Sequence, residues 1–199
     1  MRNPLSLRRS AAVLAAALAT MLLTAGSAAA ADPVDTARFL DSEILGPHNS
    51  PITGEMVVNN SEWYGIDVLP QLVILGAETS LGDPRLGGPL VRSNNFGCLR
   101  YHGADTKWGQ LSDGRAWVAG RDWYSFDSPG LGMMAFGRYL KVGLDGFYLR
   151  ALDGPPYDWP AFASRYYGRN VPGYDRYVRN LYRLERSFRA KAARAGIDW

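Results

Sequence analysis

The chain has 199 residues, 47% of them hydrophobic and 21% charged, which is enough for one domain with a sizeable core. Its formal net charge is +3, but residues 1–31 contain three arginines and no acidic residue, so residues 32–199 hold 19 basic and 19 acidic side chains. This balance removes any whole-chain argument for a nucleic-acid-binding protein.

Residues 1–31 have the pattern of a secretory signal peptide. The arginines precede an apolar run over residues 11–23, and small residues before Asp32 offer a cleavage site after Ala30 or Ala31. The apolar run is short for a membrane span. We therefore expect a secreted protein whose remaining domain, residues 32–199, has no membrane contact after cleavage.

Two helices are expected before residue 65. A weak apolar stripe predicts the first over part of residues 32–45, and a Gly/Pro-rich stretch ends it. Thr53 is placed to cap a second helix that ends at Gly65.

The next helix is the most hydrophobic stretch after residue 31. Asp67 is placed to cap it, Pro70 falls in its first turn, and residues 69–77 are apolar nearly all round, which is typical of a buried helix. Gly82 is the expected C-cap. Glu78 lies at the exit of this helix, where burial would raise its carboxyl pKa and suit it to general acid catalysis.

A small β-lobe is expected next, in a region rich in aromatic residues and glycine. Asp113-Gly114 is a strong two-residue hairpin signal, with strands over 108–111 and 115–119. Further helices are expected from Ser128-Pro129, over 159–167 and over 174–195, with residues 143–156 as a connection. The predicted fold is mainly helical, a helical lobe beside a β-hairpin lobe with a cleft between them.

Two short motifs carry a resemblance to a known family. The helix ends in Ala77-Glu78-Thr79-Ser80, and Asn-Asn-Phe-Gly follows at 94–97 after a short loop. Together they resemble the glucosaminidase-type peptidoglycan hydrolases of the lysozyme superfamily, which are similar to mannosyl-glycoprotein endo-β-N-acetylglucosaminidases. The resemblance implies a lysozyme-like fold for residues 32–199.

The resemblance also implies roles for individual residues. Glu78 would be the catalytic acid, and Asn94, Asn95 and Phe96 would line the glycan cleft. A tyrosine near the C-terminal end lines the family's site, and Tyr177 is the best match, ahead of Tyr174.

The second carboxylate of a glycosidase is not evident. Family members carry an acid just before the hairpin turn, where this chain has Gln110 and Leu111. Asp105, in a Gly-Ala-Asp-Thr loop, is the preferred substitute. Three mechanisms stay open: Asp105 activates water, the substrate's acetamido group is the nucleophile, or Glu78 acts alone as in lytic transglycosylases, whose Gly-Leu-Met-Gln signature is absent here.

Aromatic side chains are the remaining candidates for sugar binding. Tyr101, Trp108, Trp123 and Tyr124 have rings suited to stacking on sugar faces, although packing in the core and hairpin explains at least half of them. Basic residues crowd the last helix, where a solvated face is the simpler interpretation.

Cofactor and metal chemistry have no support in the sequence. Two histidines and one cysteine are scattered without ligand spacing, and Cys98 lacks the context of a Cys–His pair, so an inert thiol is expected. We expect a monomeric hydrolase of the cell wall, with no cofactor, that cleaves β-1,4 bonds of peptidoglycan glycan strands. The alternatives are a non-catalytic glycan-binding module on the same fold and a single-acid lytic transglycosylase.

Overall fold

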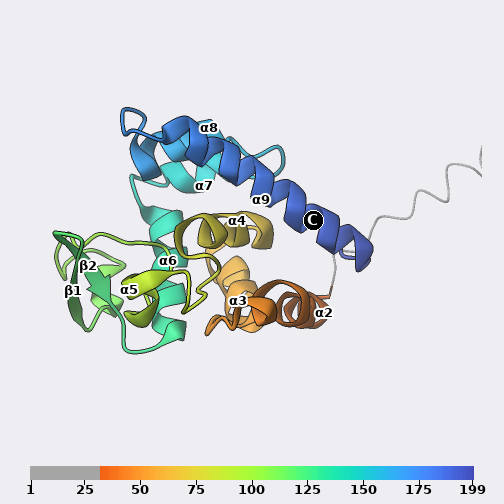
Figure 1. Ribbon diagram of the computed structural model, residues 1–199, viewed down its shortest axis with the longest axis horizontal. Coiled ribbons are helices and arrows are strands. Elements are labelled where there is room, and N and C mark those ends of the chain that lie inside the picture. The colour runs from red at the N-terminus through yellow and green to blue at the C-terminus, as the bar shows by residue number, and fades with distance from the viewer. Residues whose placement is uncertain (1–31) are drawn as a thin grey trace, which may run out of the picture. The chain divides into compact units, whose positions relative to one another are not determined.

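The described part of the chain, residues 32–199 of a computed structural model, is mainly helical and carries a small antiparallel hairpin (Figure 1). The helices are α2 (Pro33–Phe39), α3 (Gly54–Tyr64), α4 (Val68–Thr79), α5 (Gly88–Arg92), α6 (Pro129–Val142), α7 (Phe147–Ala151), α8 (Trp159–Ala163) and α9 (Tyr174–Arg194). The strands are β1 (Gly114–Val118) and β2 (Arg121–Ser125). The mainly helical class expected from the sequence is thus confirmed for these residues.

Short turns complete this order of elements. A π-helical turn, Leu40–Leu45, extends α2, and another, Ser164–Gly168, extends α8. The predicted signal peptide, residues 1–31, lies outside the described residues. Within residues 32–199 no helix combines the length and the apolar character that a membrane crossing requires.

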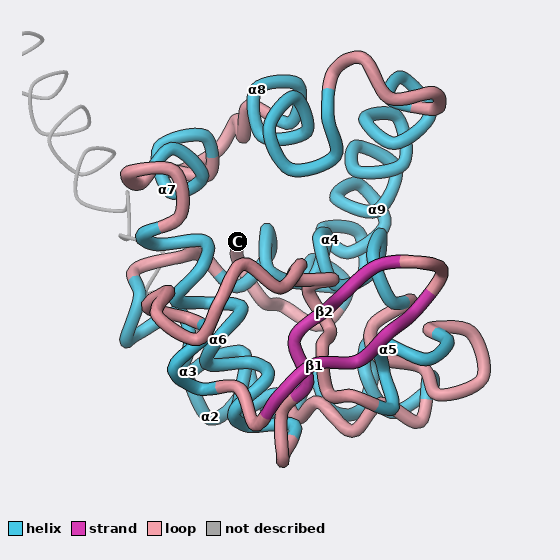
Figure 2. The backbone as a smooth tube through the Cα atoms, turned by 90° about the vertical axis from the view of Figure 1, so that its left-hand side faces the viewer, coloured by secondary structure: helices cyan, strands magenta, loops and turns pink. Residues whose placement is uncertain are grey.

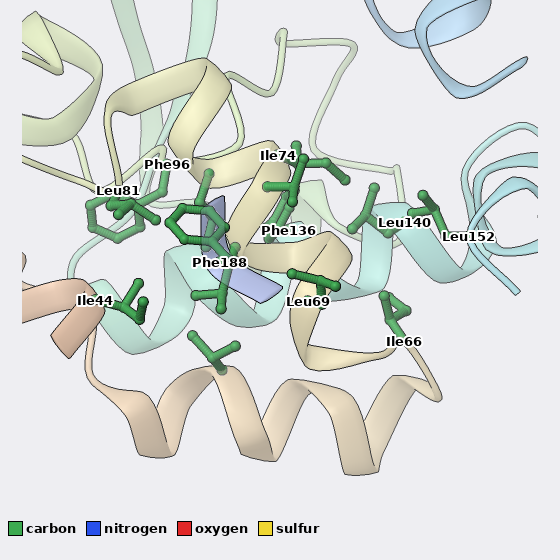
Figure 3. Close-up of a cluster of buried hydrophobic side chains, with 14 of the residues drawn as sticks. Ile44, Ile66, Leu69, Ile74, Leu81, Phe96, Phe136, Leu140, Leu152 and Phe188 are labelled. Carbon is green, nitrogen blue, oxygen red and sulfur yellow. The ribbon is translucent and has the colours of Figure 1, made fainter. Parts of the chain in front are cut away.

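Helix α4 forms the centre of the hydrophobic core. Four consecutive residues of α4, from Leu72 to Leu75, are fully buried, and α4 packs against α3 and α9. Side chains from several helices meet around it, as Figure 3 shows for Leu69, Ile74, Phe136 and Phe188. The prediction of a buried helix is confirmed, and its burial fixes the direction in which its C-terminal end points.

The ends of α4 differ in detail from the prediction. Asp67 occupies the N-cap position, but its carboxylate accepts a hydrogen bond from the Tyr157 hydroxyl at 3.0 Å and does not cap the helix. The C-cap is Ser80, in the left-handed conformation with φ of 52°, so the prediction of Gly82 is wrong by two residues. The Leu81 N–H closes this end on the Leu75 carbonyl at 3.0 Å.

Two other helix starts follow their capping residues. Thr53 accepts a hydrogen bond from the Met56 N–H at 3.3 Å at the start of α3, which ends at Gly65. Ser128 accepts from the Leu131 N–H at 3.3 Å at the start of α6. Both helices begin where the sequence predicted, because a side-chain acceptor satisfies an otherwise free N–H there.

The β-turn of the hairpin lies at Ala119-Gly120 and not at Asp113-Gly114 as predicted, so the predicted second strand is the first strand of the observed hairpin. Val118 pairs with Arg121, and the turn residues Ala119 and Gly120 have φ of 50° and 73°, both in the left-handed region required by a type I′ turn. Residues 109–111 form a 3₁₀ turn instead of the predicted first strand. The Asp113-Gly114 signal was misleading, because these residues start the ladder. β1 contacts α5, and Figures 1 and 2 both show the hairpin next to this helix.

The C-terminal half is more helical than predicted. α7 lies inside the expected connection over residues 143–156. α9 matches the prediction to within one residue, and its buried face has helical spacing through Tyr177, Leu181, Phe188 and Ala192. Since α9 packs along α4, Tyr177 is brought to the end of α4 at which Glu78 lies.

Candidate active site

A cavity of about 630 Å³ opens between the hairpin region and the helices. The hairpin wall, from residues 99–108 and strand β2, consists of Leu99, Arg100, His102, Trp108, Arg121 and Trp123. The helical wall consists of Glu78, Cys98, Tyr139, Arg165, Tyr166 and Tyr167, with Val171 at its margin. The two regions predicted from the sequence therefore enclose a cleft, and Glu78 lines it.

Glu78 is held by a side chain from the other end of the chain. The Tyr177 hydroxyl donates a hydrogen bond to Glu78 Oε1 at 2.5 Å, and the Tyr177 ring stacks on Tyr167 with centroids 4.6 Å apart. The Cys98 Sγ lies 3.8 Å from the Glu78 backbone carbonyl oxygen. The Tyr177 hydrogen bond therefore restrains one carboxyl oxygen of Glu78, and Cys98 contacts its backbone.

The surroundings of Glu78 shift the pKa of its carboxyl upward. Burial raises the pKa of Glu78 above its ordinary value, and hydrogen bonds from Tyr177 and Cys98 oppose that rise without reversing it. Burial, together with the negative charge of Glu78, raises the pKa of Tyr177 well above its usual range. Tyr177 therefore keeps its proton and acts as the donor, and Glu78 keeps its own proton to a higher pH than an exposed glutamate does.

Cys98 is not activated in this setting. Burial raises the pKa of its thiol well above the ordinary value, and the neighbouring Glu78 adds to this effect. Because the thiolate is the nucleophilic form, these surroundings argue against a nucleophile at Cys98.

Aromatic side chains form much of the cavity surface. The rings of Trp108 and Tyr139 meet edge to face, with centroids 4.9 Å apart. Trp123 donates from its indole N–H to the Val118 carbonyl at 3.1 Å, and the Arg100 guanidinium lies 5.6 Å from the Trp123 ring centroid. Of the predicted sugar-stacking residues, Trp108 and Trp123 share a cavity with Glu78.

The predicted glycan-contacting residues of the 94–97 segment do not line this cavity. Phe96 is fully buried in the core, and Asn95 is 1% exposed. The Asn95 amide donates to the Leu99 and Tyr124 carbonyls, both at 2.9 Å, and its oxygen accepts from the Leu99 N–H at 2.7 Å. Asn94 donates to the Phe126 carbonyl at 2.7 Å. These side chains fasten the hairpin to the helical core, which corrects the prediction of direct sugar contact.

Gly97, the last residue of the same segment, lies where there is no room for a side chain. A Cβ there would lie 2.4 Å from the Phe136 ring of α6. The Gly97 carbonyl also accepts a hydrogen bond from the Tyr166 hydroxyl. The Asn-Asn-Phe-Gly motif is thus accounted for by packing and backbone hydrogen bonds.

Tyr101 and Tyr124 are also absent from the cavity surface. Tyr124 is fully buried, and its hydroxyl donates to the Gly103 carbonyl at 2.7 Å. Tyr101 packs on Tyr124 with centroids 5.0 Å apart, beneath Arg115. Both form the small core of the hairpin lobe, so their prediction as stacking platforms is corrected.

Asp105 does not join Glu78. It is exposed and is not among the residues that line the cavity. In the described part of the chain, Glu78 is the one carboxylate of the cavity lining. The geometry thus gives the two-carboxylate version of the mechanism no support.

Sequence reasoning missed three arginines and three tyrosines of the lining. Arg100, Arg121 and Arg165 belong to three separate segments, and no spacing in the sequence connects them. Arg121 could have been found only with the correct hairpin register. Tyr139 falls in the helix predicted from Ser128-Pro129, and Tyr166 and Tyr167 fall in the helix predicted over 159–167; nothing in their local patterns distinguishes a cavity wall from a core.

The lining can donate one proton and many hydrogen bonds. Glu78 supplies a carboxyl whose pKa is raised, and the arginines supply guanidinium N–H groups. Within residues 32–199 no group of three or more His, Cys, Asp or Glu side chains is arranged to hold a metal ion. Comparisons of the chain with family models, with curated proteins and with solved structures find no match. The function is therefore inferred from the geometry of the site.

Proposed function

We propose that this chain is a lysozyme-like enzyme that cleaves β-1,4 bonds in the glycan strands of peptidoglycan, with Glu78 as the general acid. One observation carries this proposal: a single glutamate with a raised carboxyl pKa lines an aromatic cavity between a hairpin and a helical wall. A carboxylic acid kept neutral by its surroundings can protonate a leaving oxygen at a pH where an exposed glutamate is ionised. The secretory pattern of residues 1–31 supports action at the cell wall.

The arrangement of carboxylates favours a route with one acid. Glu78 gives its proton to the glycosidic oxygen as the bond between that oxygen and the anomeric carbon breaks. A nucleophile belonging to the substrate, its acetamido oxygen or a hydroxyl, then bonds to the anomeric carbon. When the nucleophile is a hydroxyl, the Glu78 carboxylate recovers a proton from it. When it is the acetamido oxygen, Glu78 recovers the proton from the water that completes hydrolysis.

The test is incubation with purified peptidoglycan, followed by mass spectrometry of the released fragments. A hydrolase leaves reducing ends, whereas attack by the sugar's own hydroxyl leaves fragments lighter by one water. The amino sugar at the new end shows which of the two glycosidic bonds is cut, and N-acetylglucosamine there would support the glucosaminidase assignment.

Glu78→Gln is the matched variant for this assay. The amide has nearly the same shape as the acid and can still accept the hydrogen bond from Tyr177, but it has no proton to give. We expect fragment release to fall by about 10²–10⁴-fold, the usual contribution of general acid catalysis. Release at the wild-type rate would overturn the role of Glu78.

A glycan-binding module is the second candidate, favoured by the lone carboxylate in the cavity lining. It predicts retention on peptidoglycan without any release of fragments by the wild-type protein. Retention together with release supports the enzyme, so one sample measured for both properties separates the candidates.

A further inference from the structure

The cavity concentrates positive charge in a domain that is formally neutral. Residues 32–199 contain equal numbers of basic and acidic side chains. The cavity lining nevertheless contains Arg100, Arg121 and Arg165 and a single acid, Glu78. Burial raises the pKa of Glu78, and in its protonated form this acid offsets none of the arginine charge.

These arginines have no carboxylate partners among the described residues. Ion pairs do form elsewhere in residues 32–199: Arg85 with Asp83 at 2.8 Å and Arg189 with Glu185 at 3.0 Å. Arg115, on the same hairpin, reaches Asp122 at 3.5 Å. The guanidinium groups of the cavity, by contrast, are left without a countercharge from residues 32–199.

Two of the three are positioned by aromatic rings. Arg100 lies over Trp123, with its guanidinium carbon 5.6 Å from the ring centroid, and Arg165 lies over Phe147 at 5.8 Å. Stacking on a ring restrains a guanidinium while its N–H groups stay available to a ligand. Arg100 and Arg121 belong to the hairpin wall and Arg165 to the helical wall, so the positive charge lines both walls of the cavity.

A further unpaired donor lies in the same lining. The buried indole N–H of Trp108 has no acceptor among the described residues. Guanidinium and indole groups donate hydrogen bonds and accept none. These guanidinium and indole donors therefore match a ligand rich in acceptor oxygens, and the positive charge of the arginines favours a ligand that is negatively charged.

We propose that the cavity binds an oxyanion of the substrate, a carboxylate or a phosphate, between Arg165 on one wall and Arg100 and Arg121 on the other, beside Glu78. The inference rests on the proposed function for the identity of the substrate as a glycan strand. It adds that the enzyme selects strands bearing negative charge close to the bond that is cut. The two sources of that charge are carboxylates of the strand and its peptides, and phosphates of polymers attached to the strand.

Binding is measured on the full chain carrying Glu78→Gln, so that the probe is not consumed. Three probes are titrated at low salt: an uncharged N-acetylglucosamine oligosaccharide, an oligosaccharide of the same length with alternate muramic acid carboxylates, and a phosphate-bearing wall polymer. We expect at least about tenfold tighter binding of one charged probe over the neutral probe, and a loss of this preference in high salt. The charged probe that is preferred identifies the source.

Substitutions locate the effect. The variant with Arg100→Gln, Arg121→Gln and Arg165→Gln should bind all probes equally. Arg121→Gln alone, at the exposed first residue of β2, should lose part of the preference without affecting the fold. Arg186→Gln is the matched control, because Arg186 is exposed on α9 and outside the cavity lining. Equal affinity of the parent protein for neutral and charged probes, or loss of preference in the control as well, would overturn the proposal.

The two proposals fail in different measurements. Preference for a charged probe without fragment release by the wild-type protein leaves the oxyanion site standing and removes the enzyme. Cleavage of neutral and charged strands with the same kcat/KM removes the oxyanion site and leaves the enzyme.

Discussion

The helical wall of the cavity holds its one acid with buried partners, whereas the hairpin wall presents charged side chains on a small two-stranded sheet. Glu78 lies in the last turn of a largely buried helix and accepts a hydrogen bond from Tyr177. Arg121 begins β2, Arg100 forms an isolated bridge with Trp123 of the same strand, and both are exposed; Asn95 joins this strand to the core through the Tyr124 carbonyl. A rigid position suits proton transfer, which depends on geometry, while long exposed cations attract a charged ligand without exact placement.

The largest expected effect comes from removing the Asn95 hydrogen bonds that connect the hairpin wall to the helical core. Asn95→Ala removes the acceptor of the Leu99 N–H and the side-chain donor to the Leu99 and Tyr124 carbonyls; the Leu99 carbonyl keeps its bond from the Tyr124 N–H at 3.1 Å. Each buried unsatisfied group costs about 1–3 kcal/mol, so we expect the free energy of unfolding to fall by about 3–5 kcal/mol in urea denaturation.

Asn94→Ala is the control for that measurement. Asn94 is half-buried and makes one hydrogen bond, to the Phe126 carbonyl, so its loss should cost about 1 kcal/mol. Equal falls in the free energy of unfolding of the two variants would contradict the role of Asn95 in connecting the hairpin to the helical core.

Removing the hydroxyl that holds Glu78 tests the rigid wall. Tyr177→Phe loses the hydrogen bond to Glu78 Oε1 and keeps the ring stacked on Tyr167. A hydrogen bond of about 1.5 kcal/mol corresponds to roughly a tenfold fall in kcat. That bond also lowers the pKa of Glu78, so its loss should raise this pKa and move the alkaline limit of activity to higher pH. An unchanged limit would contradict the assignment of Glu78 as the titrating acid.

Tyr174→Phe is the matched control. Its hydroxyl bonds to the Pro160 carbonyl at 2.9 Å and does not contact Glu78. We expect wild-type activity and an unchanged pH profile. A shift of the same size in this variant would show that a general disturbance of α9, and not the bond to Glu78, sets the limit.

A smaller effect should appear in stability. The folded pKa of Glu78 lies above its unfolded value, so the folded state binds more protons and is favoured at low pH. This contribution is full below the ordinary glutamate pKa and is lost as pH rises through the raised value. Glu78→Gln does not titrate, so the melting temperature of the variant, relative to wild type, should increase with pH across that window. A difference that stays constant with pH would contradict the raised pKa.

The sequence predicted the helical wall better than the hairpin wall for a physical reason. Helix α4 is a long apolar run and α9 has a regular buried face, so local pattern and tertiary packing agree. Glu78 was found because the apolar pattern of α4 predicts where the helix ends, and Glu78 lies in its last turn. Tyr177 was named from the resemblance, but only the packing of α9 on α4 reveals its hydrogen bond.

The hairpin was misplaced because its register depends on a turn with a weak local signal. Asp113-Gly114 has the stronger turn composition, yet the chain turns at Ala119-Gly120. Arg121 and Tyr124 lie outside the predicted strands, so the sequence assigned neither to a face of the hairpin; Tyr124 was named only for its aromatic ring, and Arg121 was overlooked. The burial of Asn95 and Phe96 also depends on long-range contacts that no local pattern reports.

Substitution of Asp105 is expected to have the smallest effect of all, with no change in kcat or in binding. It was the sequence-based candidate for activating water, and it is exposed, apart from the residues that line the cavity with Glu78. A true base acts mainly in the transition state, so its loss would lower kcat far more than binding. If Glu78 works alone, Asp105→Asn should retain wild-type kcat and wild-type retention on peptidoglycan. A strong fall in kcat with binding preserved would mean that the 103–108 loop moves to bring a second carboxylate into the site, and the chemistry would then be that of a carboxylate pair.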